Sequence, residues 1–135
     1  LYIQLICYRT KMTGEDIIEE LKPYRALKVI ADSADPRLID KIHAGGIKIY
    51  PVSKPAGSIV AGLSEMSEYE IFIVEPSYEL VDECRNYVWG KDKDGKYINE
   101  PADGQADHAI DATRYYVYGH ILGKIKKSKS LEGVF

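Results

Sequence analysis

The stretch Lys28-Val-Ile-Ala-Asp-Ser-Ala-Asp-Pro36 decides the fold, together with Gly45-Gly46 and the apolar run 47–52 that follow it. After Lys28 it has a short apolar run, Val-Ile-Ala, which is typical of a buried strand. Asp35 then precedes Pro36. This pair predicts a helix start, because aspartate caps backbone N–H groups and proline fits the first helical position. The two glycines end that helix and the apolar run predicts another strand. Strand, helix and strand in this order are typical of an α/β domain with a largely parallel sheet.

The same alternation continues on both sides of this unit. Apolar, β-prone runs predict strands at 1–8 and 70–74. Cap residues ahead of apolar periodicity predict helices at 13–21, from about 58, and from about 77. The alternation therefore predicts one α/β domain over the first two thirds of the chain.

The pattern changes after residue 86. Tyr87-Val-Trp and Tyr97-Ile-Asn flank the turn Lys93-Asp-Gly-Lys96. Because Asp-Gly favours a tight hairpin turn, this segment predicts a β-hairpin. A loop of small and acidic residues then leads to a predicted final helix, 106–124, with a basic tail at 124–129.

Composition limits the class of protein. The chain has 135 residues, of which 45% are hydrophobic and 29% charged, as is ordinary for one globular domain. Its net charge of −3 does not indicate a nucleic-acid binder, although a local basic groove is compatible with that average. No apolar run reaches the roughly 18 residues of a membrane span. Cys7 and Cys84 have no metal-binding spacing, so we expect reduced thiols in a cytoplasm.

The final helix holds the densest group of potential metal ligands, in Asp107-His-Ala-Ile-Asp-Ala-Thr-Arg-Tyr-Tyr116. His108 and Asp111 are three positions apart and share one helix face. Aspartate is a poor interior helix former, so a metal ligand is the favoured interpretation of Asp111. A salt bridge to Arg114 is the alternative. For Asp107, capping or a bond that orients His108 is favoured over direct ligation.

Asp32 is the third candidate ligand. It follows a buried strand, and open α/β sheets place functional groups at the carboxyl ends of their strands. Capping of the following turn is an equally good interpretation. Two carboxylates with one imidazole suit Mg²⁺ or Mn²⁺, and no cysteine pattern supports structural zinc.

Four motifs occur in order along the chain, at 31–36, 54–58, 87–96 and 107–115. Together they resemble the C-terminal nuclease domain of the large terminase subunit of tailed bacteriophages and prophages, over nearly the whole chain. The resemblance implies an RNase H-like fold, an α/β mixed sheet flanked by helices with an inserted β-hairpin. It also implies cleavage of concatemeric viral DNA during packaging.

The resemblance further implies two-metal phosphodiester hydrolysis with Mg²⁺ or Mn²⁺. Asp32 matches the second catalytic acid of the family, and His108 and Asp111 match the pair on its final helix. The first acid of the family lies on the first strand, whereas 1–8 resembles the third strand and carries no acid. We therefore expect residues 1–135 to be one RNase H-like nuclease domain, with its first two strands and an ATPase domain upstream. The isolated fragment is expected to be weakly active.

The expected substrate is double-stranded DNA, bound mostly through its phosphates. Lys54, in a Pro/Gly loop, is the favoured contact. Arg37 and the hairpin residues Lys91, Lys93 and Lys96 are weaker candidates, with an ordinary solvated charge as the alternative. The resemblance implies the terminase small subunit and the portal protein as partners, the bacterial host cytoplasm as the location, and no membrane.

Two other functions remain open from the sequence. One is another RNase H-like nuclease, of the junction resolvase type, although the hairpin and the Lys54 loop favour terminase. The other is a non-catalytic DNA-docking or assembly module, which the absence of the first acid supports.

Overall fold

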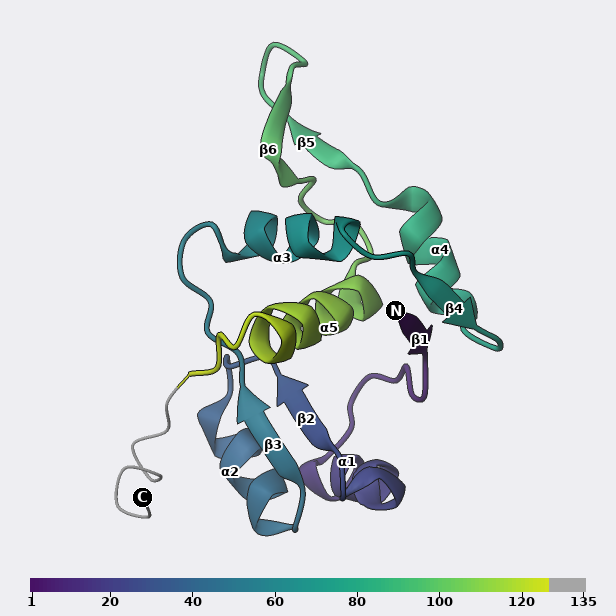
Figure 1. Cartoon of the computed structure of the whole chain (residues 1–135), viewed down its shortest axis with the longest axis vertical. Coiled ribbons are helices and arrows are strands. Elements are labelled where there is room, and N and C mark those ends of the chain that lie inside the picture. Colours follow the sequence, from purple (N-terminus) through teal and green to yellow (C-terminus); the bar gives the residue numbers. More distant parts are fainter. Residues whose placement is uncertain (127–135) are drawn as a thin grey trace.

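The computed structural model describes residues 1–126 and shows short strands among helices (Figure 1). The strands are β1 (Tyr2–Gln4), β2 (Lys28–Ala31), β3 (Lys48–Pro51), β4 (Phe72–Val74), β5 (Trp89–Lys91) and β6 (Tyr97–Pro101). The helices are α1 (Gly14–Leu21), α2 (Pro36–Ala44), α3 (Ser58–Ser67), α4 (Tyr78–Asn86) and α5 (His108–Tyr116), with a 3₁₀ turn at Lys22–Tyr24 and a π-helical turn at Val117–Ile121.

The strands form separate pairs. β1 pairs in parallel with β4, and β2 pairs in parallel with β3, with Lys28 opposite Lys48. β5 and β6 form an antiparallel hairpin. Among the described residues these three pairs are not hydrogen bonded to one another, so the strands form three small sheets, two parallel and one antiparallel. The α/β class and the parallel pairing are confirmed.

The first strand is shorter than predicted. β1 ends at Gln4, and the next backbone N–H, that of Leu5, donates to Ser77 Oγ at 2.9 Å. Because a side chain in the loop before α4 takes this donor, the segment 5–8 leaves the ladder.

Helices α1 and α2 begin at the cap residues that predicted them in the sequence. Thr13 and Asp16 form a capping box at α1, and Asp35 Oδ1 accepts from Leu38 N at 3.1 Å at α2. Pro36 opens α2 as predicted.

The predicted hairpin is also confirmed. Its turn places Gly95 at φ +78°, and Asp92 Oδ1 accepts from the backbone N–H groups of Asp94 and Lys96, both at 2.9 Å. All residues 91–100 are exposed, and Figure 1 shows the hairpin projecting from the rest of the fold.

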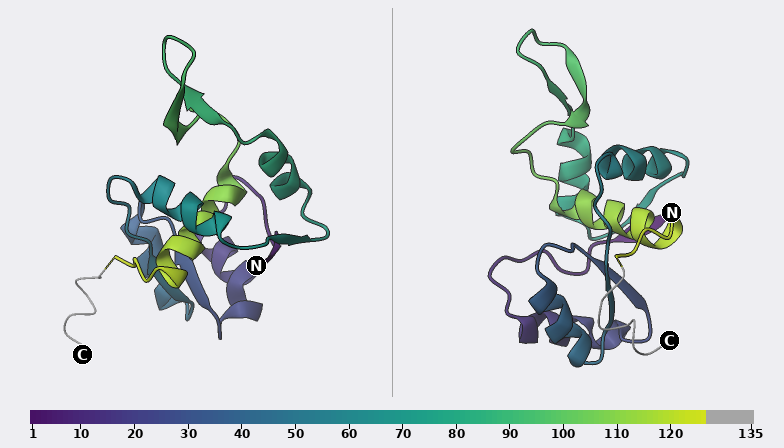
Figure 2. Two further views of the ribbon diagram at one scale, coloured as in Figure 1. Left: turned by 45° about the horizontal axis from the view of Figure 1, so that its top comes forward. Right: turned by 90° about the vertical axis from the view of Figure 1, so that its left-hand side faces the viewer.

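The core has two parts. One lies between α1, α2 and the β2–β3 pair and centres on Ile42, Ile47 and Ile49. The other lies between α4 and α5 and centres on Leu80, Ala109 and Ile110. Helix α5 packs on β2 as well as on α3 and α4, so it joins the two parts (Figures 1 and 2).

The final helix differs from the predicted span 106–124. Its α-helical part ends at Tyr116, and a π-helical turn follows. That turn brings Gly119 so close to β2 that a Cβ atom there would lie 2.8 Å from Ile30 Cγ2. Of the predicted basic tail 124–129, residues 127–129 lie outside the described residues.

In the part of the chain that the structure describes, no helix is long and apolar enough to cross a membrane. Cys7 and Cys84 are free thiols.

Candidate metal and DNA site

Asp111 is held by a buried arginine one helical turn away. Arg114 donates to Asp111 Oδ1 from Nη2 at 2.9 Å and from Nε at 3.2 Å. The Arg114 side chain is 4% exposed, whereas that of Asp111 is 30% exposed. Gly62 of α3 makes room for this arginine, because a Cβ there would lie 2.6 Å from Arg114 Cγ. The salt bridge that the sequence left as an alternative is therefore formed, and it orients a carboxylate that still reaches solvent.

Asp32 is held by a lysine from the next strand–helix connection. It directly follows β2, and its Oδ1 accepts from Lys54 Nζ at 2.5 Å and from Ala34 N at 3.1 Å. The hydrogen bond that Lys54 donates to Asp32 raises the pKa of Lys54, so this lysine is cationic at neutral pH. The turn-capping interpretation of Asp32 is thus realised, together with an ion pair that the sequence did not predict. Both side chains are well exposed, at 44% for Asp32 and 37% for Lys54.

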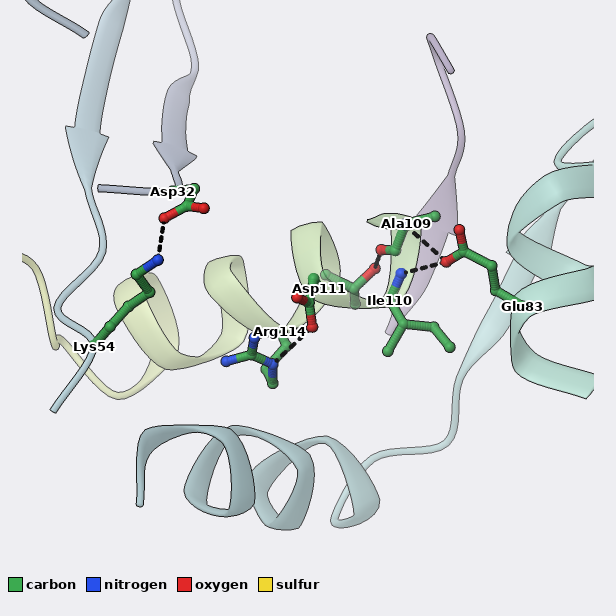
Figure 3. Close-up of polar contacts among 8 residues, drawn as sticks. Asp32, Lys54, Glu83, Ala109, Ile110, Asp111 and Arg114 are labelled. Atoms are coloured by element: carbon green, nitrogen blue, oxygen red, sulfur yellow. Dashed lines mark hydrogen bonds and ion pairs between the residues drawn. The ribbon is translucent and has the colours of Figure 1, made fainter. Parts of the chain in front are cut away.

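Tyr115 joins the two pairs. Its ring centroid lies 4.7 Å from Arg114 Cζ and 5.8 Å from Lys54 Nζ. Burial raises the pKa of Tyr115, and the negative charges of Asp111 and Asp32 raise it further. Figure 3 shows both ion pairs beside α5, where the Asp32–Lys54 pair lies farther from the N-terminal residues Ala109 and Ile110 than the Asp111–Arg114 pair does. The Tyr115 ring thus contacts the cationic partner of each carboxylate. It links Asp32, which follows β2, to Asp111 of α5.

The two carboxylates each keep an oxygen that could bind a cation. All hydrogen bonds to Asp32 and Asp111 use Oδ1, and Oδ2 of each has no hydrogen-bond partner among residues 1–126. A carboxylate fixed through one oxygen presents the other in a defined direction. Carboxylate oxygen is the donor that Mg²⁺ and Mn²⁺ prefer.

His108 is the first residue of α5, three positions before Asp111, and within residues 1–126 its imidazole makes no hydrogen bond to Asp32 or Asp111. Its exposed ring makes an edge contact with Tyr8, with ring centroids 6.4 Å apart at 60°. Asp107 sits at the N-cap position, yet its side chain makes no capping bond within the described residues. Of the two favoured interpretations of Asp107, capping by its side chain is not realised, because Glu83 of α4 accepts from the backbone N–H groups of Ala109 and Ile110 instead. A bond that orients His108 stays a prediction. Burial, followed by the nearby charge of Asp111, raises the pKa of Asp107.

The donor types fit a hard divalent cation, but their number falls short of a complete site. Across residues 1–126, no three His, Cys, Asp or Glu side chains form a group that could hold a metal ion. Asp32, Asp111 and His108 therefore have suitable donor atoms, but within residues 1–126 they do not come together as a three-residue metal site.

The predicted DNA contacts fall into three places, the Lys54 loop, helix α2 and the hairpin. Lys54 lies at the site itself, paired with Asp32. Arg37 is exposed in the first turn of α2, and Lys91, Lys93 and Lys96 are exposed on the hairpin, where Lys91 Nζ lies 4.9 Å from the centroid of the Tyr97 ring.

Glu83 and Tyr115 are the residues that the sequence-based prediction missed. A signal for Glu83 exists, because it lies three positions after Leu80 and four before Tyr87, on the apolar face of α4. A charged residue on such a face needs bonding partners. No comparable local signal marks Tyr115.

Comparisons with known proteins agree with this geometry. Residues 1–118 match the family described as Terminase RNAseH like domain. The large terminase subunit of Bacillus phage SPP1 is 32% identical over 96 residues, covering 68% of this chain and 22% of that protein. The chain therefore spans about a fifth of that relative.

A solved structure shows the same fold. The nuclease domain of the SPP1 large terminase (g2p), crystallised with bound Mn, superposes with a TM-score of 0.75 at 26% identity. The match covers 86% of this chain and 70% of that one. The mixed α/β architecture, the alternation of strands and helices and the match over residues 1–118 show that this chain belongs to the terminase RNase H-like domain family.

Proposed function

We propose that this domain is the nuclease of a phage or prophage terminase large subunit, which cuts concatemeric double-stranded DNA during genome packaging. The observation that carries the proposal is the pair of carboxylates, Asp32 and Asp111, that β2 and α5 hold in one set of contacts around Tyr115. Family membership and the Mn in the SPP1 structure support it.

Asp32, Asp111 and His108 are the proposed ligands for Mg²⁺ or Mn²⁺, in a site that takes two ions. When bound, such ions stabilise the charge that develops on a scissile phosphate and lower the pKa of a water nucleophile. Arg114 keeps Asp111 in one rotamer through two hydrogen bonds. Lys54 neutralises Asp32 and, from its exposed loop, is placed to contact a DNA phosphate beside that carboxylate.

We also propose that further strands complete the sheet. β1 and β2 each keep one edge without a strand partner within the described residues. An apolar hollow beside β2 extends to Asp32 and is lined by Ile17, Leu21, Leu38 and Ile42. A strand paired with the free edge of β2 would cover this hollow, and a carboxylate on it would supply the missing metal ligand.

Other contacts of the assembly follow from the same proposal. Arg37 and the hairpin lysines Lys91, Lys93 and Lys96 would contact DNA phosphates outside the centre of the site. The terminase small subunit and the portal protein are the proposed protein partners, and the bacterial host cytoplasm is the proposed location.

A nicking assay on supercoiled plasmid DNA tests the proposal with the full-length protein. We expect Mn²⁺-dependent nicking with little sequence preference, and its loss in Asp111→Ala. Asp40→Ala, an exposed substitution on α2, is the matched control and should nick at the wild-type rate. Nicking that survives Asp111→Ala or excess EDTA would contradict the site. DNA binding without any Mn²⁺-dependent nicking would favour a docking module.

A further inference from the structure

Glu83 is a buried carboxylate that bonds to the first turn of the helix carrying the proposed ligands. It lies on α4 and is 3% exposed. Its Oε2 accepts from the backbone N–H groups of Ala109 at 2.8 Å and Ile110 at 3.0 Å. Its Oε1 accepts from Tyr8 Oη at 2.8 Å. Figure 3 shows Glu83 beside the N-terminal end of α5, opposite the end near Lys54.

These bonds replace an ordinary helix cap. The first N–H groups of a helix have no partner within it, and the residue before the helix commonly bonds to them. Asp107 holds that position but makes no such side-chain bond in the part of the chain described. Glu83 therefore takes over the capping, and its negative charge is favourable at the positive end of the helix dipole.

The same carboxylate also reaches His108 through Tyr8. Tyr8 donates to Glu83, and its ring makes the edge contact with the His108 imidazole. The bond to Glu83 raises the pKa of Tyr8, which keeps its hydroxyl protonated as a donor. One side chain thus fixes both the backbone of the first turn and an aromatic neighbour of His108.

We infer that Glu83 is a positioning residue, which sets the direction in which His108 and Asp111 present their metal-binding atoms. His108 is the first residue of α5 and Asp111 lies one turn on, so a change at the helix start moves both. This inference rests on the proposed function, because it concerns the same metal site.

Two measurements on the full-length protein test the inference, namely Mn²⁺ affinity by electron paramagnetic resonance and amide hydrogen exchange without metal. The Mn²⁺ signal that Asp111→Ala removes defines the site. We expect Glu83→Ala to weaken this binding about tenfold, the effect typical of residues that orient metal ligands. Glu83→Gln keeps a carbonyl oxygen for the two N–H groups and should recover much of the affinity. Exchange in Glu83→Ala should accelerate selectively at Ala109 and Ile110.

Leu80→Ala is the matched control for a purely structural effect. Leu80 is buried on the same helix and packs in the same part of the core, but does not bond to α5 backbone groups. It should accelerate exchange along α5 evenly and leave Mn²⁺ affinity unchanged. Wild-type affinity in Glu83→Ala, or an equal loss in Leu80→Ala, would overturn the inference alone. A wild-type protein that binds no Mn²⁺ at this site would overturn the proposed function as well.

Discussion

Helices α1 and α5 both begin with an acid bonded to backbone N–H groups, but the acids come from different places. At α1, Asp16 Oδ2 accepts from Thr13 N at 2.8 Å and Thr13 Oγ1 accepts from Asp16 N at 3.2 Å, in solvent. At α5, the acid is Glu83, which is buried and lies 26 residues before Ala109.

A helix start can therefore be fixed either by residues adjacent in the sequence, as at α1, or by a residue of another helix, as at α5. The start of α1 is specified within four consecutive residues and can form before the domain packs. The start of α5 exists only once α4 lies against it. Because His108 and Asp111 belong to that turn, we expect the geometry of the proposed metal site to depend on the bonds from α5 to Glu83.

Removal of the tertiary cap should have the largest effect. Glu83→Ala leaves two backbone N–H groups and the Tyr8 hydroxyl without their acceptor. Each unsatisfied buried donor costs about 1–3 kcal/mol, so we expect a loss of roughly 3 kcal/mol in the free energy of unfolding. Urea denaturation followed by circular dichroism measures it. A loss below about 1 kcal/mol would mean that water replaces Glu83 without difficulty.

Removal of the local cap should cost less. Thr13→Ala deletes one N-cap side chain on an exposed helix start, which typically costs about 1 kcal/mol. The same urea titration applies, and Mn²⁺-dependent nicking should be unchanged. If Thr13→Ala destabilised the protein as much as Glu83→Ala, the contrast between the two helix starts would be lost.

The local cap should also depend on pH. The bond from Thr13 N holds the pKa of Asp16 below its usual value of 3.8. An acid with a lowered pKa in the folded state stabilises it above the unfolded pKa, and this contribution is lost as pH falls through the folded pKa. The stability difference between wild type and Asp16→Ala should therefore be constant near neutral pH and shrink below about pH 3.8. Thermal melts across this range measure it, and a difference that grows with acidity would contradict the sign.

The smallest effect is expected for the exposed ion pair. Lys54→Ala removes a partner of Asp32, but both side chains are well exposed, and such pairs contribute about 0–1 kcal/mol. We expect the urea midpoint to change little while DNA affinity falls. A stability loss comparable to that of Glu83→Ala would show that this exposed ion pair stabilises the fold as much as the buried Glu83 does.

Features with local causes could be predicted from the sequence. The Asp35-Pro36 helix start, the helix start at Thr13 and the Asp94-Gly95 turn each depend on a few adjacent residues, and all three form as predicted. The Asp111–Arg114 bond was available as an alternative for the same reason, because residues three apart meet on a helix.

Features with distant causes could not be predicted in the same way. Lys54 and Asp32 are 22 residues apart, and only the pairing of β2 with β3 brings them together. Glu83 reaches α5 through the packing of two helices, and the separation of the strands into pairs depends on which edges find a partner. The candidate ligands and the local partner Arg114 were thus accessible from sequence, whereas the contacts made by the distant residues Lys54 and Glu83 were not.

Anomalous X-ray diffraction from crystals of the full-length protein grown with Mn²⁺ would show whether Asp32 and Asp111 bind the same metal centre. We expect a Mn peak within coordination distance of carboxylate oxygens of both Asp32 and Asp111, and its absence in Asp111→Ala crystals. A wild-type map with no Mn at these carboxylates, or with Mn bound by a different set of residues, would contradict it.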